Sequence, residues 1–188
     1  MRNSLLVLTM AAFLSGCTTV VNSVVKEPIM PDATSSPIGS DINDIKMDTF
    51  IGVNIKKADP ELRRAHVNVH VYNSVVLLTG EVPTKELRLL AGDTARAYTG
   101  QRKVHNELQV RGNSSIVART NDALISAKVA TKLTFDKEIK SSNIEVTAED
   151  SVVYLMGKVR EINGEKATAI ASQTSGVRSV VKVFEYVD

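Results

Sequence analysis

The feature that most constrains the fold of this chain is a nine-residue apolar stretch that occurs twice, 77 residues apart. The copies are residues 74–82, SVVLLTGEV, and residues 151–159, SVVYLMGKV. Each copy is too short to span a membrane, and its β-branched and aliphatic residues are typical of a strand buried on both faces. Gly80 and Gly157 near the ends indicate a bulge or the close approach of another backbone. Because flanking positions repeat at the same spacing, we expect two small domains derived from one ancestral unit.

The N-terminus has the layout of a bacterial secretion signal. Arg2 provides a positive charge, residues 5–13 form a short apolar segment, and Leu14-Ser15-Gly16-Cys17 follows. The last four residues resemble the lipobox of bacterial lipoproteins. This resemblance implies that a signal peptide, 1–16, is removed and that Cys17 receives fatty acyl groups such as palmitate, which together anchor a protein firmly. The alternative is an ordinary signal peptide that happens to contain a cysteine. Cys17 is the only cysteine, so a disulfide within the chain is excluded.

Residues 17–40 connect this anchor to the folded part. They contain prolines and small polar residues without periodicity, which predicts a flexible, lipid-anchored tether. Thr18 after the acylated cysteine resembles the pattern of outer-membrane lipoproteins, so we expect an outer-membrane anchor with the protein facing the periplasm. The inner membrane stays open as an alternative, because this sorting rule differs between bacteria.

The first domain is expected at 41–111. Its first helix has apolar residues at helical spacing and ends at Asp59-Pro60. Strand 66–72 alternates apolar and polar residues and turns through Asn73-Ser74 into the first central strand. Thr84 is expected to cap the second helix, and a final strand passes through Val104, Leu108 and Val110.

A linker is expected at 112–118, and a second domain at 119–188 repeats the order of elements. Asp122 is expected to cap its first helix, whose buried face carries Ile125, Val129 and Leu133. Glu149-Asp150 is the expected turn between its first two strands. The predicted fold class is α+β, with two tandem α-β-β-α-β domains. In each, two helices pack on one face of a mixed three-stranded sheet.

Short glycine motifs recur at matching places in both copies. They are Gly80-Glu81-Val82 and Gly100 with Val104, then Gly157-Lys158-Val159 and Gly176 with Val180. Two units of this order with these motifs resemble BON domains. Asn106 also matches the family pattern, whereas Lys182 departs from it. With the lipobox, the doubled unit resembles two-domain BON lipoproteins of the outer membrane.

The resemblance implies a non-enzymatic protein that maintains outer-membrane integrity. It also implies that the second domain binds anionic phospholipids, such as phosphatidylglycerol and cardiolipin, through its first helix and the following loop. The residues expected to make this contact are Leu124, Lys128, Thr131, Lys132, Thr134, Phe135, Lys137 and Lys140. Such a mixture suits a membrane surface, because apolar side chains enter the acyl region while ammonium groups meet lipid phosphates.

Two other interpretations of this region stay open. In one, Leu124 and Phe135 pack against the first domain and the lysines are only solvated. In the other, the same helix or a sheet edge binds a protein, and the chain is an adaptor for outer-membrane assembly machinery.

Composition and motifs argue against other functions. The net charge of +2 and the aromatic content of 4% argue against binding of nucleic acid. Of the three histidines, His66 and His70 share a strand face but lie about 13 Å apart, too far to share a metal ion. With no second cysteine and no acidic cluster nearby, we expect no metal site. The chain has no phosphate-binding glycine loop and no nucleophile beside a base, so we expect neither enzyme activity nor a cofactor.

Overall fold

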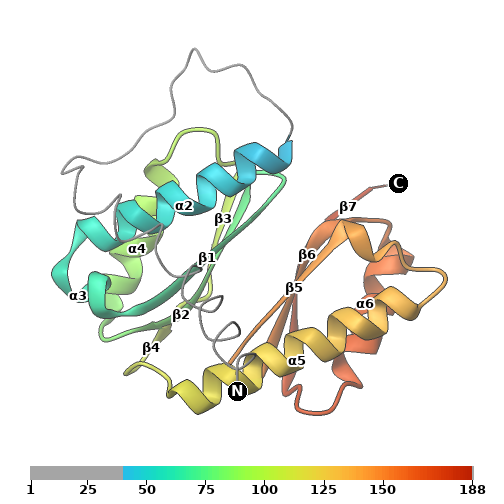
Figure 1. Cartoon of the computed structure of the whole chain (residues 1–188). Coiled ribbons are helices and arrows are strands. Elements are labelled where there is room, and N and C mark those ends of the chain that lie inside the picture. Colours follow the sequence, from blue (N-terminus) through green and yellow to red (C-terminus); the bar gives the residue numbers. More distant parts are fainter. Residues whose placement is uncertain (1–39, 188) are drawn as a thin grey trace, which may run out of the picture.

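The computed structural model describes residues 40–187 of the chain. The predicted signal peptide, 1–16, the acylation site Cys17, Thr18 and all but the last residue of the tether lie outside the described residues. Within the described part the chain forms two α+β units in the expected order (Figure 1).

The first unit contains a mixed sheet and three helices. Its elements are α2 (Ser40–Ala58), α3 (Pro60–Arg64), β1 (His66–Tyr72), β2 (Val75–Val82), α4 (Lys85–Ala97), β3 (Lys103–Asn106) and β4 (Gln109–Val110). β1 is antiparallel to β2, whereas β3 and β4 are both parallel to β2. The predicted final strand is therefore present but interrupted, with Leu108 buried at the interruption. Thr84 caps α4 as predicted, and Asp59 ends α2 and caps the unpredicted α3 by accepting a hydrogen bond from the Glu61 N–H.

The second unit repeats this arrangement. Its elements are α5 (Ile116–Phe135), η1 (Ser141–Asn143), β5 (Ile144–Glu149), β6 (Val152–Val159), α6 (Glu161–Ser172) and β7 (Ser179–Tyr186). β5 is antiparallel to β6 and β7 is parallel to it, as predicted.

Two boundaries in the second unit differ from the prediction. The hydroxyl of Ser115 caps α5 by accepting a hydrogen bond from the Ala118 N–H at 3.1 Å, and Asp122 lies inside the helix. The linker expected at 112–118 is therefore shorter, because its last three residues are helical. Glu149 is a buried residue at the end of β5, and the turn consists of residues 150–151.

A buried aspartate in the first helix of each unit holds the hairpin turn. Asp122 accepts hydrogen bonds from the N–H groups of Asp150 at 2.9 Å and Ser151 at 2.8 Å. In the first unit Asp44 accepts hydrogen bonds from the N–H groups of Asn73 at 2.5 Å and Ser74 at 2.9 Å. The turn residues have φ angles between 48° and 62°, the left-handed conformation that a tight two-residue hairpin requires. The carboxylate pairs N–H groups that would otherwise be buried without a partner, so it fixes both the turn and the helix above it.

The two sheets pack face to face. Helices cover the outer face of each sheet and the inner faces meet, which gives the layer order helix, sheet, sheet, helix (Figure 1). The buried residues of this contact are Val75, Leu77, Tyr154, Met156 and Val183. Every residue of β2 is buried, because alternate side chains face the helices and the second unit. The contact therefore confirms that the repeated stretch is a strand covered on both faces.

Gly80 and Gly157 are positions where two backbones meet. A Cβ atom at Gly80 would lie 2.0 Å from the His66 carbonyl oxygen, and one at Gly157 would lie 2.2 Å from the Asn143 carbonyl oxygen. Gly80 also has a φ of 109°, which other residues rarely adopt. The close backbone approach predicted from both glycines is thus confirmed.

The segment 111–115 is tied to both units. Arg111 donates hydrogen bonds to the buried Glu81 of the first unit at 2.9 Å and to Asp150 of the second at 3.0 Å. Asn113 accepts a hydrogen bond from the His66 N–H at 3.2 Å and donates one to the Arg64 carbonyl at 2.9 Å. These contacts place the connection between the units firmly against both of them.

Replacing Asp122 with alanine leaves two turn N–H groups buried without a partner. We expect the free energy of unfolding, measured by urea denaturation with circular dichroism, to fall by about 2–4 kcal/mol. Asp93→Ala is the control, because it removes an exposed carboxylate paired with Arg96 and should cost less than about 1 kcal/mol. Equal losses for the two variants would contradict the role assigned to Asp122.

Candidate functional site

The outward side of α5 carries an apolar stripe. Its buried side holds Ile125, Val129 and Leu133, as predicted. On the other side the side chains of Val117, Leu124 and Phe135 are 79%, 55% and 81% exposed. These three residues are 7 and 11 positions apart, close to two and three helical turns, so they follow one line along the helix. Among residues 40–187, neither α5 nor any other helix has the length and apolar character needed to cross a membrane.

The structure places all eight residues of the predicted lipid contact on this surface or in the loop after it. Those exposed residues are Leu124, Lys128, Thr131, Lys132, Thr134, Phe135, Lys137 and Lys140. Lys128 and Thr131 follow Leu124 by one and two turns and share its side of α5. The interpretation in which Leu124 and Phe135 pack against the first unit is wrong, because both side chains are more than half exposed.

The surface is positively charged because its lysines have no acidic partners. Within the described part of the chain, no ion pair or hydrogen bond involves the side chains of Lys128, Lys132, Lys137 and Lys140. The one acidic residue of α5, Asp122, is buried against the hairpin turn. The exposed side of α5 therefore carries cations and apolar groups without negative charge.

Lys166 of α6 pairs with the acidic residues of the loop after α5. Its ammonium group donates hydrogen bonds to Asp136 at 2.9 Å and to Glu138 at 2.8 Å. The hydrogen bond from Lys166 and that from the Glu138 N–H hold the pKa of the Asp136 carboxyl below its ordinary range. The hydrogen bonds that Lys166 donates to the carboxylates of Glu138 and Asp136 raise the pKa of its ammonium group. Lys137, which lies between the two acids in sequence, forms no ion pair with either of them.

The threonines of this surface have hydroxyl groups that are already paired. Thr131 donates a hydrogen bond to the Ala127 carbonyl at 2.7 Å, and Thr134 donates one to the Ala130 carbonyl at 2.9 Å. A paired hydroxyl costs less free energy when it leaves water. These positions therefore suit a contact with a poorly hydrated surface.

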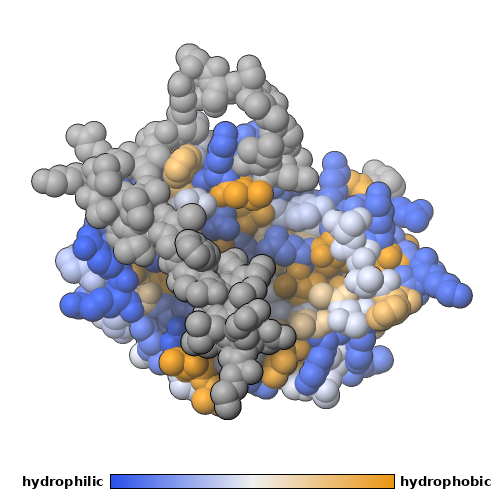
Figure 2. Space-filling view, viewed as in Figure 1, coloured by the Kyte–Doolittle hydropathy of each residue, from blue (hydrophilic) through white to orange (hydrophobic). Residues whose placement is uncertain are grey.

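The start of the stripe lies in the predicted linker. Ile116 and Val117 are helical instead, and their side chains are 77% and 79% exposed. The signal that identifies them is Ser115, a favoured capping residue directly before an apolar run. Figure 2 shows hydrophobic patches along the lower edge of the molecule, over α5, interspersed with hydrophilic side chains.

The expectation that no acidic cluster lies near the histidines is wrong, because two carboxylates lie beside His66. The imidazole of His66 lies 3.5 Å from the carboxylate of Glu149, and Glu81 is its partner in the β1–β2 register. Spacing along the chain does not predict that two carboxylates lie beside His66, because Glu81 belongs to the neighbouring strand and Glu149 to the other unit. His70 contacts a different carboxylate, Glu145, at 3.4 Å.

Comparison with known proteins identifies the family. The BON domain family matches residues 54–112 and 121–188, one match in each unit, and the chain belongs to this family. The outer membrane lipoprotein DolP of Haemophilus influenzae is 30% identical over 94% of this chain and 91% of its own length. A 21 kDa hemolysin of Actinobacillus pleuropneumoniae is 28% identical, over 79% of this chain and 77% of its own length. Osmotically-inducible protein Y of Escherichia coli is 24% identical, over 79% and 75%.

Lys166→Met tests the charge pairing in the loop. We expect the pKa of the Asp136 carboxyl, measured by an NMR pH titration, to rise toward its ordinary value of 3.8. It should stay somewhat below that value, because the N–H groups of Glu138 and Ile139 still donate to the carboxylate. Lys132→Met, which removes a lysine without an acidic partner, is the control and should leave this pKa unchanged. The same pKa in Lys166→Met as in the original chain would contradict the pairing.

Proposed function

We propose that the chain is a non-enzymatic, lipid-anchored protein of the bacterial envelope. It binds anionic phospholipid through α5 of its second BON domain and helps to maintain the outer membrane from the periplasmic side. The name of the Haemophilus influenzae relative, an outer membrane lipoprotein, supports the location. The lipobox that ends at Cys17 supports the anchor.

One observation carries the proposal, namely the combination of groups on the outward side of α5. The exposed apolar side chains of Val117, Leu124 and Phe135 lie in line, and unpaired lysines flank them. A helix face that only contacts water usually carries both acidic and basic residues, and a phenylalanine that is 81% exposed is unusual there. Lipid with a negative headgroup supplies both the apolar phase and the anion that this surface lacks.

The expected mode of binding is a helix that lies in the membrane interface. Apolar side chains enter the boundary between headgroups and acyl chains, and lysine ammonium groups meet phosphates. Each lysine near an anionic bilayer contributes about 1 kcal/mol, and this contribution weakens with salt. The electrostatic contribution of the lysines and the apolar contribution of the inserted side chains are both needed. Four lysines alone, or three apolar side chains alone, give only modest binding.

The acyl anchor and α5 act together in this proposal. Acyl chains on Cys17 keep the protein at the membrane whatever its lipid composition, whereas α5 responds to anionic phospholipid. Tethering raises the local concentration of α5 at the membrane, so a weak contact is sufficient for function.

The binding test uses the chain without residues 1–17, which lacks the acylation site and keeps every described residue. We expect it to bind phosphatidylglycerol-containing vesicles, but not phosphatidylcholine vesicles, in a sedimentation assay. The double substitution Leu124→Ser with Phe135→Ser should weaken this binding by at least about tenfold, from the loss of two buried apolar side chains. Leu89→Ser with Ile162→Ser is the matched control, because those side chains are 61% and 74% exposed on other helices.

Equal binding by the two double variants would contradict the assignment to α5. Absence of binding to anionic vesicles by the unsubstituted chain would overturn the phospholipid part of the proposal. Crosslinking from position 124 in cells then distinguishes the alternative function. A single dominant protein adduct, rather than lipid adducts, would indicate an adaptor for assembly machinery.

Cys17→Ser tests the anchor in cells. We expect the variant to move from the outer-membrane fraction to a soluble or unprocessed form, since no thiol is left to accept an acyl group. In cells that lack the natural chain, it should also fail to restore exclusion of a large antibiotic by the outer membrane. An acylated, membrane-bound Cys17→Ser protein would contradict the lipobox assignment.

A further inference from the structure

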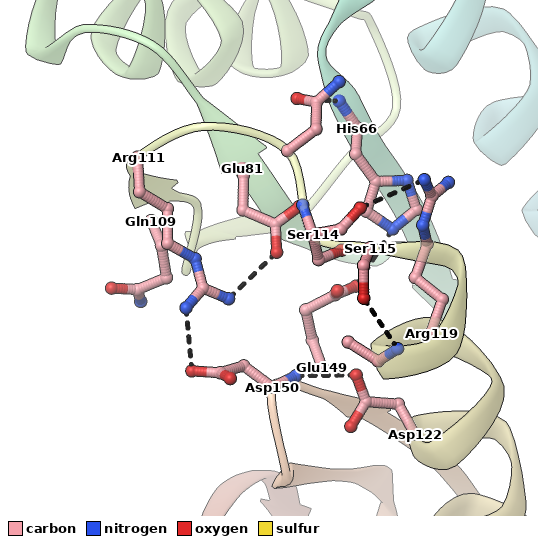
Figure 3. Close-up of polar contacts among 12 residues, drawn as sticks. His66, Glu81, Gln109, Arg111, Ser114, Ser115, Arg119, Asp122, Glu149 and Asp150 are labelled. Atoms are coloured by element: carbon pink, nitrogen blue, oxygen red, sulfur yellow. Dashed lines mark hydrogen bonds and ion pairs between the residues drawn. The ribbon is translucent and has the colours of Figure 1, made fainter.

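Three potential metal ligands meet where the two units join. His66 on β1 and Glu81 on β2 are register partners in the first unit, and Glu149 ends β5 in the second. One ligand atom from each lies within 4.8 Å of the other two. Figure 3 shows Ser114, from the connecting segment, beside Glu81, with His66 and Glu149 nearby. Among residues 40–187 this is the one group of histidine, cysteine and acidic side chains with such spacing.

The cluster also contains buried polar atoms that lack a partner. Glu149 is 95% buried, and while its Oε2 accepts a hydrogen bond from the Asn68 amide at 3.0 Å, its Oε1 accepts none. The hydroxyl of Ser114 is the other buried side-chain atom without a partner in the described part of the chain. Buried oxygens are normally paired, so two unpaired oxygens at one cluster indicate that a further group belongs there.

The charges in the cluster favour a cation. Arg111 and the N–H of Ser114 donate to Glu81, at 2.9 and 3.1 Å. Glu149 forms no ion pair with an arginine or lysine among residues 40–187, and the basic group that contacts it is His66 at 3.5 Å. A buried carboxylate without a paired charge is costly, and a cation between His66 and Glu149 would remove that cost.

We propose that this cluster binds a divalent transition-metal ion, with Zn²⁺ as the best fit. Zinc accepts both imidazole nitrogen and carboxylate oxygen as ligands, and the Ser114 hydroxyl or a water would complete four-coordination around it. Ligand atoms around zinc lie about 3.3 Å apart, so the present spacing closes by side-chain movements of about 1 Å. Arg111 and Asn68 already hold the carboxylates from outside, as supporting residues do in metal sites.

The site is accessible and would act on the joint between the units. His66, Asn68, Arg119 and Glu149 line a crevice of about 220 Å³, so an ion can reach two of the three ligands, His66 and Glu149, from this side. Because two ligands come from the first unit and one from the second, a bound ion clamps the two sheets together. Metal binding therefore stabilises the pairing of the two domains as well as each domain.

The test is calorimetric titration of the chain without residues 1–17 with zinc chloride at neutral pH, with no other ligand. We expect one saturable site per chain. Glu149→Gln keeps the shape and the Asn68 contact but removes the charge, and it should weaken zinc binding by more than about tenfold. The matched control is Glu145→Gln, because Glu145 contacts His70 across the same joint, at 3.4 Å, outside the three-ligand cluster. It should bind zinc as the original chain does.

Thermal unfolding gives a second measurement. Zinc should raise the melting temperature of the original chain and of Glu145→Gln, and should leave that of Glu149→Gln almost unchanged. If Glu149→Gln does not fold by circular dichroism, His66→Asn and Glu81→Gln replace it with the same expected loss. Absence of saturable binding by the original chain, or undiminished binding by these folded variants, would overturn the site and leave ordered water as the partner of the buried oxygens.

Discussion

The packing of the two sheets against each other is the contact on which the rest of the structure depends. Leu77 from one unit meets Tyr154 and Met156 from the other, in a cluster with five buried members. At about 1.5–3 kcal/mol for each fully buried side chain, this cluster contributes on the order of 10 kcal/mol before the entropic cost of ordering the joint. Because the inner faces are used in this way, all main helices face outward, and the free side of α5 is available to a partner outside the molecule.

The two units share a scaffold but differ where the proposed function lies. Asp44 and Asp122 hold the hairpin turns in the same way, so the helix-to-sheet geometry is common to both. The helix α2 contains three acidic residues, Asp41, Asp44 and Asp48, whereas α5 contains only one, Asp122. The short helix α3 follows α2, while a loop with Lys137 and Lys140 follows α5. Duplication thus retained the buried contacts and left one outer helix free to become cationic and apolar.

Local patterns predicted most of the fold and most of the candidate site. The doubled stretch, Thr84 and Asp59-Pro60 predicted the central strands and helix boundaries correctly. Asp122 was misread as a helix cap, because an aspartate near a helix start can cap the helix or bond a distant turn. The apolar residues of β2 and β6 indicate cover on both sides without identifying what covers them. The approach of His66 to Glu149 depends on that same packing, so no spacing along the chain predicts it.

The most direct test of the central claim is NMR mapping of the chain without residues 1–17 during titration with phosphatidylglycerol micelles. The account predicts amide shift changes confined to about residues 116–140, covering α5 and the loop after it. Residues at the sheet-on-sheet contact, such as Leu77 and Met156, should not shift, and phosphatidylcholine micelles should have no effect. Changes on α2 or α6 with α5 unaffected would contradict the claim that the outward side of α5 is the membrane-binding surface.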